Sequence, residues 1–291
     1  MKICFLTTVI FVAFDIFHLA ASAEPEFECG ISEDPPSSSH HRVINGTVAT
    51  KGQLPWIAFI PIRGCTASII SRNYILTAGH CAASGHSVTV SVGVADEKDS
   101  SAISIPSAKV IRHPGYRRCH RVAIHDITII KLSKSLNFTK NVRPLCLKKS
   151  FKETEKDVAL ISGYGAKKFY PGPPPITPEY YDGKLRWGTS KFVLEKTCRR
   201  DYKEIEECLT EAKSLCGKGI KEVDVYHGDS GSPISIQNPN RADGKRQYMQ
   251  VGICSFGDVD VYQGKPAVYA RVSEYCDWIT ETTEGEVTCQ D

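Results

Sequence analysis

The sequence lacks an excess of charge of either sign. Its 291 residues include 36 Lys and Arg against 33 Asp and Glu, a formal net charge of +3. Nucleic acids and acidic membrane surfaces attract strongly basic proteins, and a net charge of +3 is too small for such attraction to be strong. We therefore expect no nucleic-acid partner.

Closely spaced metal ligands are also missing. No His-Glu-x-x-His segment or comparable cluster is present, although such clusters are how metal-dependent hydrolases hold zinc. We find no internal repeat either. We expect no metal and no cofactor.

Long apolar runs are absent after the first 23 residues. Those residues combine an early lysine, an apolar stretch at 3–14 and small residues at 21–23, which is typical of a secretory signal. A membrane-spanning helix is the alternative, but Asp15 and His18 leave the run short of the roughly 20 apolar residues that a span needs. We expect residues 1–23 to be a signal peptide, the protein to be secreted and extracellular, and no membrane anchor.

Cysteine, in contrast, is plentiful. The chain has 12 cysteines, and only Cys4 falls in the expected signal. A cytosolic enzyme would rarely keep so many thiols, so the number agrees with export and with disulfides. Asn45 and Asn137 each begin an Asn-x-Thr triplet, a glycosylation acceptor in exported chains.

Short runs rich in β-branched and aromatic residues, separated by Gly, Pro, Asn and Ser, fill most of the chain after residue 42. This pattern of residues predicts an all-β sandwich or barrel. The expected strands are 56–62, 67–70, 74–77, 88–94, 127–132, 158–163, 191–194, 233–236, 249–256 and 267–272, and a helix is expected around 272–282.

Two stretches lack this pattern of short apolar runs. Residues 24–42 are polar, without apolar periodicity, and predict an exposed, cleavable linker. Residues 167–183 contain five prolines, which exclude a central strand and predict a long surface loop.

Three segments carry side chains suited to nucleophilic catalysis. His80 lies in Thr-Ala-Gly-His-Cys, Asp126 precedes Ile-Thr-Ile-Ile-Lys-Leu, and Ser230 lies in Gly-Asp-Ser-Gly-Ser-Pro. A serine hydroxyl needs a histidine to take its proton, and the histidine needs a carboxylate to fix its tautomer and support its positive charge. Glycine-rich backbone could turn the N–H groups of Gly228 and Ser230 toward an oxyanion.

Each segment has a simpler interpretation when taken alone. A histidine beside a cysteine is often only packed, an aspartate can end a loop, and Gly-Asp-Ser-Gly is good turn chemistry. The three segments together, in the order His, Asp, Ser, favour catalysis.

These segments, with Arg-Val-Ile-Asn-Gly at 42–46 and Ser-Phe-Gly at 255–257, resemble the trypsin-like members of the chymotrypsin family. The resemblance covers about residues 43–278. It implies two antiparallel six-stranded β-barrels with a C-terminal helix and an active site in the cleft between the barrels. It also implies a secreted serine endopeptidase that is made as a zymogen and hydrolyses peptide bonds through a Ser-His-Asp triad and an acyl-enzyme.

Two rival functions remain to be weighed against this one. A protease homologue that has lost catalysis would have replaced one of the three side chains, and none is replaced. A metal-dependent hydrolase would need the ligand cluster that the sequence lacks.

The resemblance implies activation by cleavage after Arg42. The new amino group of Val43 would then pair with Asp229 beside the nucleophile and order the oxyanion hole and the substrate pocket. Residues 24–42 would be a pro-segment and 43–291 the peptidase domain. An activating protease is then an expected partner.

The residue six positions before the nucleophile, Asp224, corresponds to the base of the family's primary pocket, which implies cleavage after Arg or Lys. Asp224 as an ordinary loop carboxylate is the alternative. Val225 and Ala267 depart from trypsin and would fit long basic side chains less well, whereas Gly257 keeps one wall open. Ser255 begins the strand that would pair with the substrate.

Partners implied by the resemblance are a protein or peptide substrate and a secreted protease inhibitor. The proline-rich stretch at 167–183 would lie beside the cleft. It is either a tolerated insertion, which we favour, or a loop that restricts which substrates enter.

The resemblance also implies three disulfides: Cys65–Cys81, Cys198–Cys216 and Cys29–Cys146. Two bridges usual in trypsins are absent, because Ala159 and Ile236 occupy one pair of sites and Tyr226 occupies half of the other. The pairing of the remaining cysteines stays open, and one of them is either free or bonded to another molecule; they are Cys119, Cys208, Cys254, Cys276 and Cys289.

Overall fold

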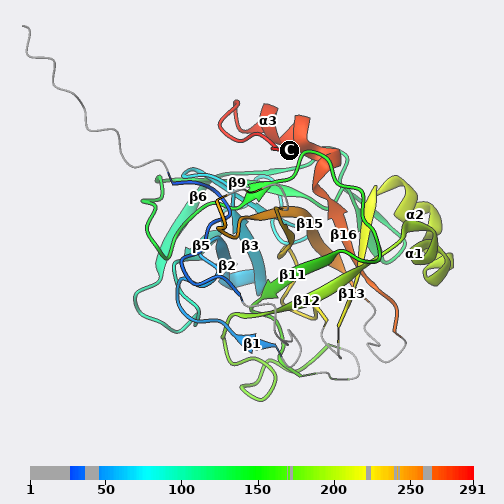
Figure 1. The fold of residues 1–291 in the computed structure, drawn as a ribbon, viewed down its shortest axis with the longest axis horizontal. Coiled ribbons are helices and arrows are strands. Elements are labelled where there is room, and N and C mark those ends of the chain that lie inside the picture. Colours follow the sequence, from blue (N-terminus) through cyan, green and yellow to red (C-terminus); the bar gives the residue numbers. More distant parts are fainter. Residues whose placement is uncertain are drawn as a thin grey trace, which may run out of the picture.

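Two β-barrels form the body of the protein, with a short helix near the C-terminus (Figure 1). The computed structural model describes residues 27–36, 46–168, 170, 173–220, 224–238, 241, 243–257 and 264–291. The predicted all-β class and the two six-stranded antiparallel barrels are confirmed.

The first barrel is closed in the order β2-β3-β4-β9-β6-β5, and all of its pairings are antiparallel. Its interior is filled by β-branched and other aliphatic side chains such as Ile69, Ile75 and Ile129, which suit a pleated, buried surface. The strands are β2 Ile57–Ile60, β3 Cys65–Ile69, β4 Tyr74–Thr77, β5 Thr89–Val92, β6 Ile103–Arg112 and β9 Thr128–Leu132.

The second barrel runs β12-β11-β14-β15-β16-β13 and closes because β13 also pairs with β12. Two short strands extend this sheet: β1 Thr47–Val48 pairs with β12, and β10 Cys146–Leu147 pairs with β15 in parallel. The barrel strands are β11 Val158–Gly163, β12 Arg186–Val193, β13 Ser214–Gly219, β14 Pro233–Gln237, β15 Tyr248–Phe256 and β16 Ala267–Arg271.

Each barrel carries one insertion between two of its strands. A hairpin of β7 Arg117–Cys119 and β8 Val122–Ile124 lies between β6 and β9 of the first barrel. A helical segment lies between β12 and β13 of the second. It consists of α1 Glu195–Asp201, the 3-10 turn η2 Lys203–Ile205 and α2 Glu206–Glu211.

The strand predictions were wrong in several details. The run at 56–62 ends as a strand at Ile60 because Pro61 begins a 3-10 turn, η1 Pro61–Arg63. The run at 191–194 is the end of a longer strand, β12. The strands β6 and β13 and the helical segment were missed; β6 buries only two of its ten residues and shows little alternation. The C-terminal helix begins as the 3-10 turn η4 Val272–Tyr275 and continues as α3 Cys276–Thr282.

The prediction of an exposed linker at 24–42 was wrong for residues 27–36. Gly30 donates its N–H to the carbonyl of Pro144 at 2.8 Å and accepts from Tyr248 at 2.8 Å, and Ser32 is buried. Backbone pairing and a disulfide at Cys29 therefore hold this stretch against the second barrel.

The proline-rich stretch forms a loop, as predicted: no described residue in 167–183 belongs to a strand or helix. The loop is nevertheless anchored. Lys167 donates its N–H to the carbonyl of Tyr180 at 2.8 Å, and Asp182 receives two hydrogen bonds from Arg186 at 2.7 and 2.6 Å.

Candidate active site

A histidine and an aspartate from the first barrel are joined by two hydrogen bonds. His80 follows β4 and Asp126 lies between β8 and β9. The Nδ1 of His80 lies 2.8 Å from Oδ2 of Asp126, and the backbone N–H of His80 donates to Oδ1 at 2.8 Å. These bonds fix the ring so that Nδ1 carries a proton and Nε2 is left to accept one.

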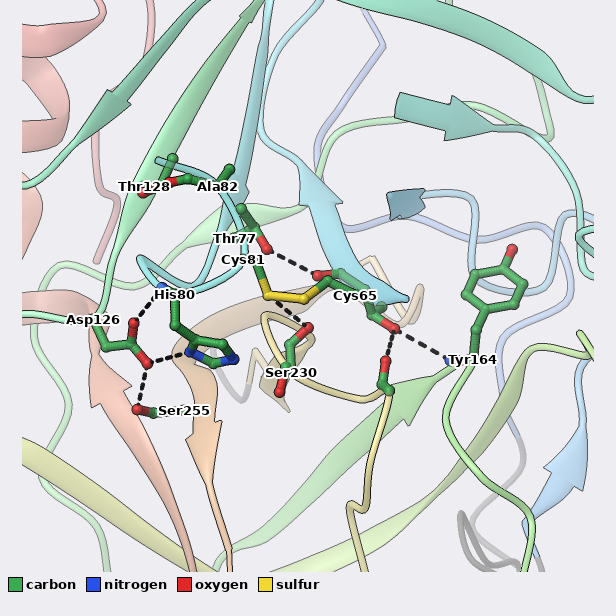
Figure 2. The surroundings of a disulfide bond; sticks show 12 residues. Cys65, Thr77, His80, Cys81, Ala82, Asp126, Thr128, Tyr164, Ser230 and Ser255 are labelled. Carbon is green, nitrogen blue, oxygen red and sulfur yellow. Dashed lines mark hydrogen bonds and ion pairs between the residues drawn. A yellow bond between two sulfur atoms is a disulfide. The ribbon is translucent and has the colours of Figure 1, made fainter. Parts of the chain in front are cut away.

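The second barrel supplies a third donor to the same carboxylate. The hydroxyl of Ser255, on β15, donates to Oδ2 of Asp126 at 2.5 Å (Figure 2). Asp126 is almost fully buried. Burial alone would raise the pKa of Asp126, but the hydrogen bonds and charge of His80 and the bond from Ser255 outweigh it, so the pKa lies below its ordinary value. The carboxylate is therefore anionic at neutral pH.

The serine of the third motif lies on a loop that the first barrel holds. The N–H of Thr66 on β3 donates to the carbonyl of Ser230 at 2.9 Å, and the Thr66 hydroxyl donates to the carbonyl of Gly228 at 3.1 Å. The Sγ of Cys81, next to His80, lies 3.6 Å from the carbonyl oxygen of Ser230 (Figure 2). Thr66 is a residue that the motif analysis missed, because a threonine in a strand carries no distinctive signal.

Two N–H groups on this loop are available to a ligand. Within the described ranges, neither the N–H of Gly228 nor that of Ser230 donates to another protein atom. Gly228 has a φ of 98°, and a Cβ there would lie 2.8 Å from the Cα of Gly165. The loop conformation therefore requires glycine at this position.

Asp229, next to Ser230 in the sequence, lies against the end of β11 in the second barrel. It is fully buried, and its carboxylate accepts the N–H groups of Gly165 and Tyr226, each at 2.9 Å. A Cβ on Gly163 would lie 2.0 Å from Oδ1 of Asp229, so the acid occupies space that only glycine leaves open. In the part of the chain that the structure describes, no cation forms an ion pair with it, and burial raises the pKa of Asp229 to about 7.

A groove of about 630 Å³ begins at Ser230 and runs between the two insertions. Ser255 and Gly257, two of the predicted substrate-binding residues, line it, together with Val225. It is further bordered by residues of the hairpin and of the helical segment, among them His120, Arg121, Val122, Tyr202, Glu204 and Ile205.

Two of the predicted substrate-binding residues, Asp224 and Ala267, are not part of the lining of this groove. The Oδ1 of Asp224 accepts the N–H of Val225 at 2.9 Å, and burial raises the pKa of Asp224 to about 7. Ala267 is buried, with its Cβ 3.9 Å from the place that a Cβ on Gly257 would take. The methyl group of Ala267 thus faces the open wall at Gly257.

Five disulfides are formed among the described residues, and the three pairs that the resemblance implied are joined. Cys119 bonds to Cys208 and Cys276 to Cys289, while Cys254 is free and buried. Cys119 lies on the hairpin of the first barrel and Cys208 on α2, so this bond joins the two insertions next to residues that line the groove. At the sites of a missing bridge, Ala159 and Ile236 pack in the core of the second barrel.

Two groups of potential metal ligands occur in the described residues. One contains Cys65, His80 and Cys81, and the other contains His120, Glu207 and Cys208. Every cysteine in them belongs to a disulfide, so none offers the thiolate that a zinc site uses.

Several predicted residues lie outside the described residues, namely the signal at 1–23, Arg42, Val43 and the acceptor Asn45. The second acceptor, Asn137, is exposed on the loop after β9. No helix within the described ranges has the length and apolar character needed to cross a membrane.

Comparison with known proteins places this geometry in a family. Residues 43–279 match the family model described as Trypsin. Phenoloxidase-activating factor 3 of Holotrichia diomphalia is 29% identical, and the match covers 87% of this chain and 74% of that protein. Phenoloxidase-activating enzyme 1 of Spodoptera litura is 29% identical, and the match covers 92% of this chain and 72% of that protein.

A solved structure agrees with these sequence matches. Neuropsin, a serine protease expressed in the limbic system of mouse brain, is 26% identical, with a TM-score of 0.67 over 82% of this chain and 98% of that chain. The chain therefore belongs to the trypsin family and is a serine endopeptidase.

Proposed function

We propose that His80, Asp126 and Ser230 form the catalytic triad of a secreted endopeptidase that cleaves after Arg or Lys. Nε2 of His80 takes the proton of the Ser230 hydroxyl as Oγ attacks the scissile carbonyl. The carbonyl oxygen becomes an oxyanion, which accepts the N–H groups of Gly228 and Ser230. His80 then gives its proton to the leaving amine, and water hydrolyses the acyl-enzyme by the same steps.

The observation that carries this proposal is the hydrogen-bonded pair of His80 and Asp126 beside a serine whose own N–H is free for an oxyanion. His80 and Ser230 line one continuous groove. Asp126 is buried, anionic and bonded by three donors, which is what a carboxylate needs in order to support the positive charge that develops on His80.

A fluorophosphonate probe tests the nucleophile. We expect it to label Ser230 alone after cleavage at Arg42 with immobilised trypsin, as read by peptide mass spectrometry. Ser232, buried two residues away on the same loop, serves as the matched control: Ser232→Ala should still be labelled. His80→Ala should abolish labelling. A label on another residue, or none on the cut protein, contradicts the proposal.

For the primary specificity we propose Asp224 as the partner of a basic side chain. Val225 lines the groove and donates its N–H to the Asp224 carboxylate, and a carboxylate beside a groove favours a guanidinium or ammonium group. Two neighbours limit the fit, because Val225 offers no hydroxyl and the buried methyl group of Ala267 lies against the wall at Gly257. We expect Arg and Lys substrates to be cleaved, and a clear preference for Phe or Leu would rule out Asp224 as the selector.

The raised pKa of Asp224 gives this assignment a pH dependence. A carboxyl that titrates at about 7 is mostly protonated below that pH, and only its ionised form attracts a cation. We expect the affinity of the cut enzyme for benzamidine to fall by about tenfold per pH unit below pH 7. Isothermal titration calorimetry between pH 5 and 8 measures it.

The variant Asp224→Asn is the control for that titration. It should bind benzamidine weakly and with no pH dependence in the same range. A wild-type affinity that is constant from pH 5 to 7, or tight binding by Asp224→Asn, would show that another group selects the substrate.

We further propose that the protein is a secreted zymogen with a signal at 1–23, a pro-segment at 24–42 and a peptidase domain at 43–291. The abundant disulfides and the exposed acceptor Asn137 support export. Two relatives are named as activating factors or enzymes, which supports a protein substrate. An upstream activating protease and a secreted inhibitor are the proposed partners.

A further inference from the structure

A second groove, of about 660 Å³, shares Ser230 and His227 with the first and is otherwise lined by different residues. Its lining includes His80 and Gly228, so it begins at the proposed catalytic centre. Two isoleucines flank it, Ile62 at 80% exposure and Ile176 at 92%. They are the most exposed large hydrophobic side chains in the described part of the chain.

The two isoleucines come from different barrels and are held in place by local structure. Ile62 lies in the 3-10 turn η1, which Pro61 begins and which Gly64 ends with an N–H to carbonyl bond of 3.2 Å to Pro61. Ile176 lies on the proline-rich loop, which the hydroxyl of Tyr226 also anchors through the carbonyl of Tyr170 at 2.6 Å. Neither side chain is part of a packed core.

The position of this groove identifies its occupant. If the acyl side of a substrate pairs with Ser255–Gly257 in the first groove, the chain after the scissile bond has to leave through the second, because Ser230 borders both. The occupant is therefore the leaving segment of the substrate protein.

The lining indicates which leaving segments fit. Its floor includes the rings of Phe59 and Tyr164, whose centroids are 5.1 Å apart. The charged side chains along it are Arg63 and Glu97, one of each sign. A charged leaving segment would therefore be attracted by one of them and repelled by the other. Covering two exposed aliphatic side chains is favourable only with an apolar partner.

We propose that the exposed pair Ile62 and Ile176 selects substrate proteins with aliphatic residues directly after the cleaved bond. This inference rests on the proposed function, and it specifies the class of protein that the endopeptidase would cut. A basic residue followed by two aliphatic residues would be the preferred sequence. The chain's own segment at 42–44, Arg-Val-Ile, has this form.

The test uses internally quenched peptides with one acyl side ending in Arg and three leaving segments: Val-Ile, Gly-Ser and Asp-Glu. With enzyme cut at Arg42, we expect kcat/KM for the Val-Ile peptide to exceed that for the other two by about tenfold, a typical effect of an apolar contact on specificity. In the double variant Ile62→Ser/Ile176→Ser, the ratio of Val-Ile to Gly-Ser should fall to about twofold or less. A ratio within one variant does not depend on how much of that variant folds.

A matched variant and a simple substrate separate the possible outcomes. Val158→Ser changes an aliphatic side chain of 50% exposure that borders neither groove, and it should keep the wild-type ratio. An Arg p-nitroanilide, which has no residues after the cleaved bond, reports the proposed function alone. If the nitroanilide is cut but the three peptides are cut equally, or the double variant keeps the ratio, the inference is wrong while the proposed function stands. If the nitroanilide is not cut, the proposed function itself fails.

Discussion

Replacing Asp126 by asparagine is expected to lower kcat/KM for an Arg amide substrate by about four orders of magnitude. The carboxamide oxygen can still accept the backbone N–H of His80, but its NH₂ group then faces Nδ1. The imidazole has to accept that hydrogen bond at Nδ1 and carry its proton on Nε2. It can no longer take the proton of Ser230, and the positive charge that develops on the ring loses its anionic partner.

The variant Ser255→Ala is the control for this prediction. It removes one donor to Oδ2 of Asp126 and leaves the tautomer of His80 unchanged. A hydrogen bond to a charged group contributes about 1.5–3 kcal/mol, so the loss should be roughly tenfold to a hundredfold. Steady-state kinetics at pH 8, with thermal unfolding to check the fold, compares the two. If Asp126→Asn retained a tenth of the activity, or lost less than Ser255→Ala, the role of Asp126 would have to be revised.

The variant Arg42→Gln is expected to give a protein that treatment with trypsin does not activate, with activity about a thousandfold below that of the cut wild type. The reason lies at Asp229, which is fully buried without a cationic partner in the described residues. A new ammonium group at Val43 would supply that partner. Leaving a buried charge unpaired costs about 3–5 kcal/mol, which corresponds to a factor of about a thousand.

Two further variants complete this test. Arg42→Lys keeps a site for trypsin and should be activated as the wild type is. Asp229→Ala should be cut but remain poorly active, because the cleaved amino group has no carboxylate to pair with. Amino-terminal sequencing shows where each protein is cut, and the disulfide Cys29–Cys146 should keep both pieces together on a gel without reductant. Full activity from uncut Arg42→Gln would exclude activation by this route.

The sequence was most informative where chemistry restricts the choice of residue. His80, Asp126 and Ser230 each stand in a distinctive segment, and the structure brings the first two within hydrogen-bonding distance and the third to the same groove. Alternating or continuous apolar runs likewise predicted most barrel strands, among them β11.

Other features depend on contacts between distant segments, which no local pattern records. Thr66 holds the nucleophile loop through a long-range hydrogen bond, and a threonine in a strand is unremarkable on its own. The helices α1 and α2 are only seven and six residues long, too short for a clear helical period. The pairing of Cys119 with Cys208 joins two insertions whose proximity only the folded barrels determine.

The Cys119–Cys208 disulfide also restricts the relative motion of the two barrels. Because this covalent bond joins an insertion of each barrel next to residues that line the first groove, it limits how far those two insertions can move apart. The width of the first groove at that point is therefore restrained covalently, independently of the packing between the barrels.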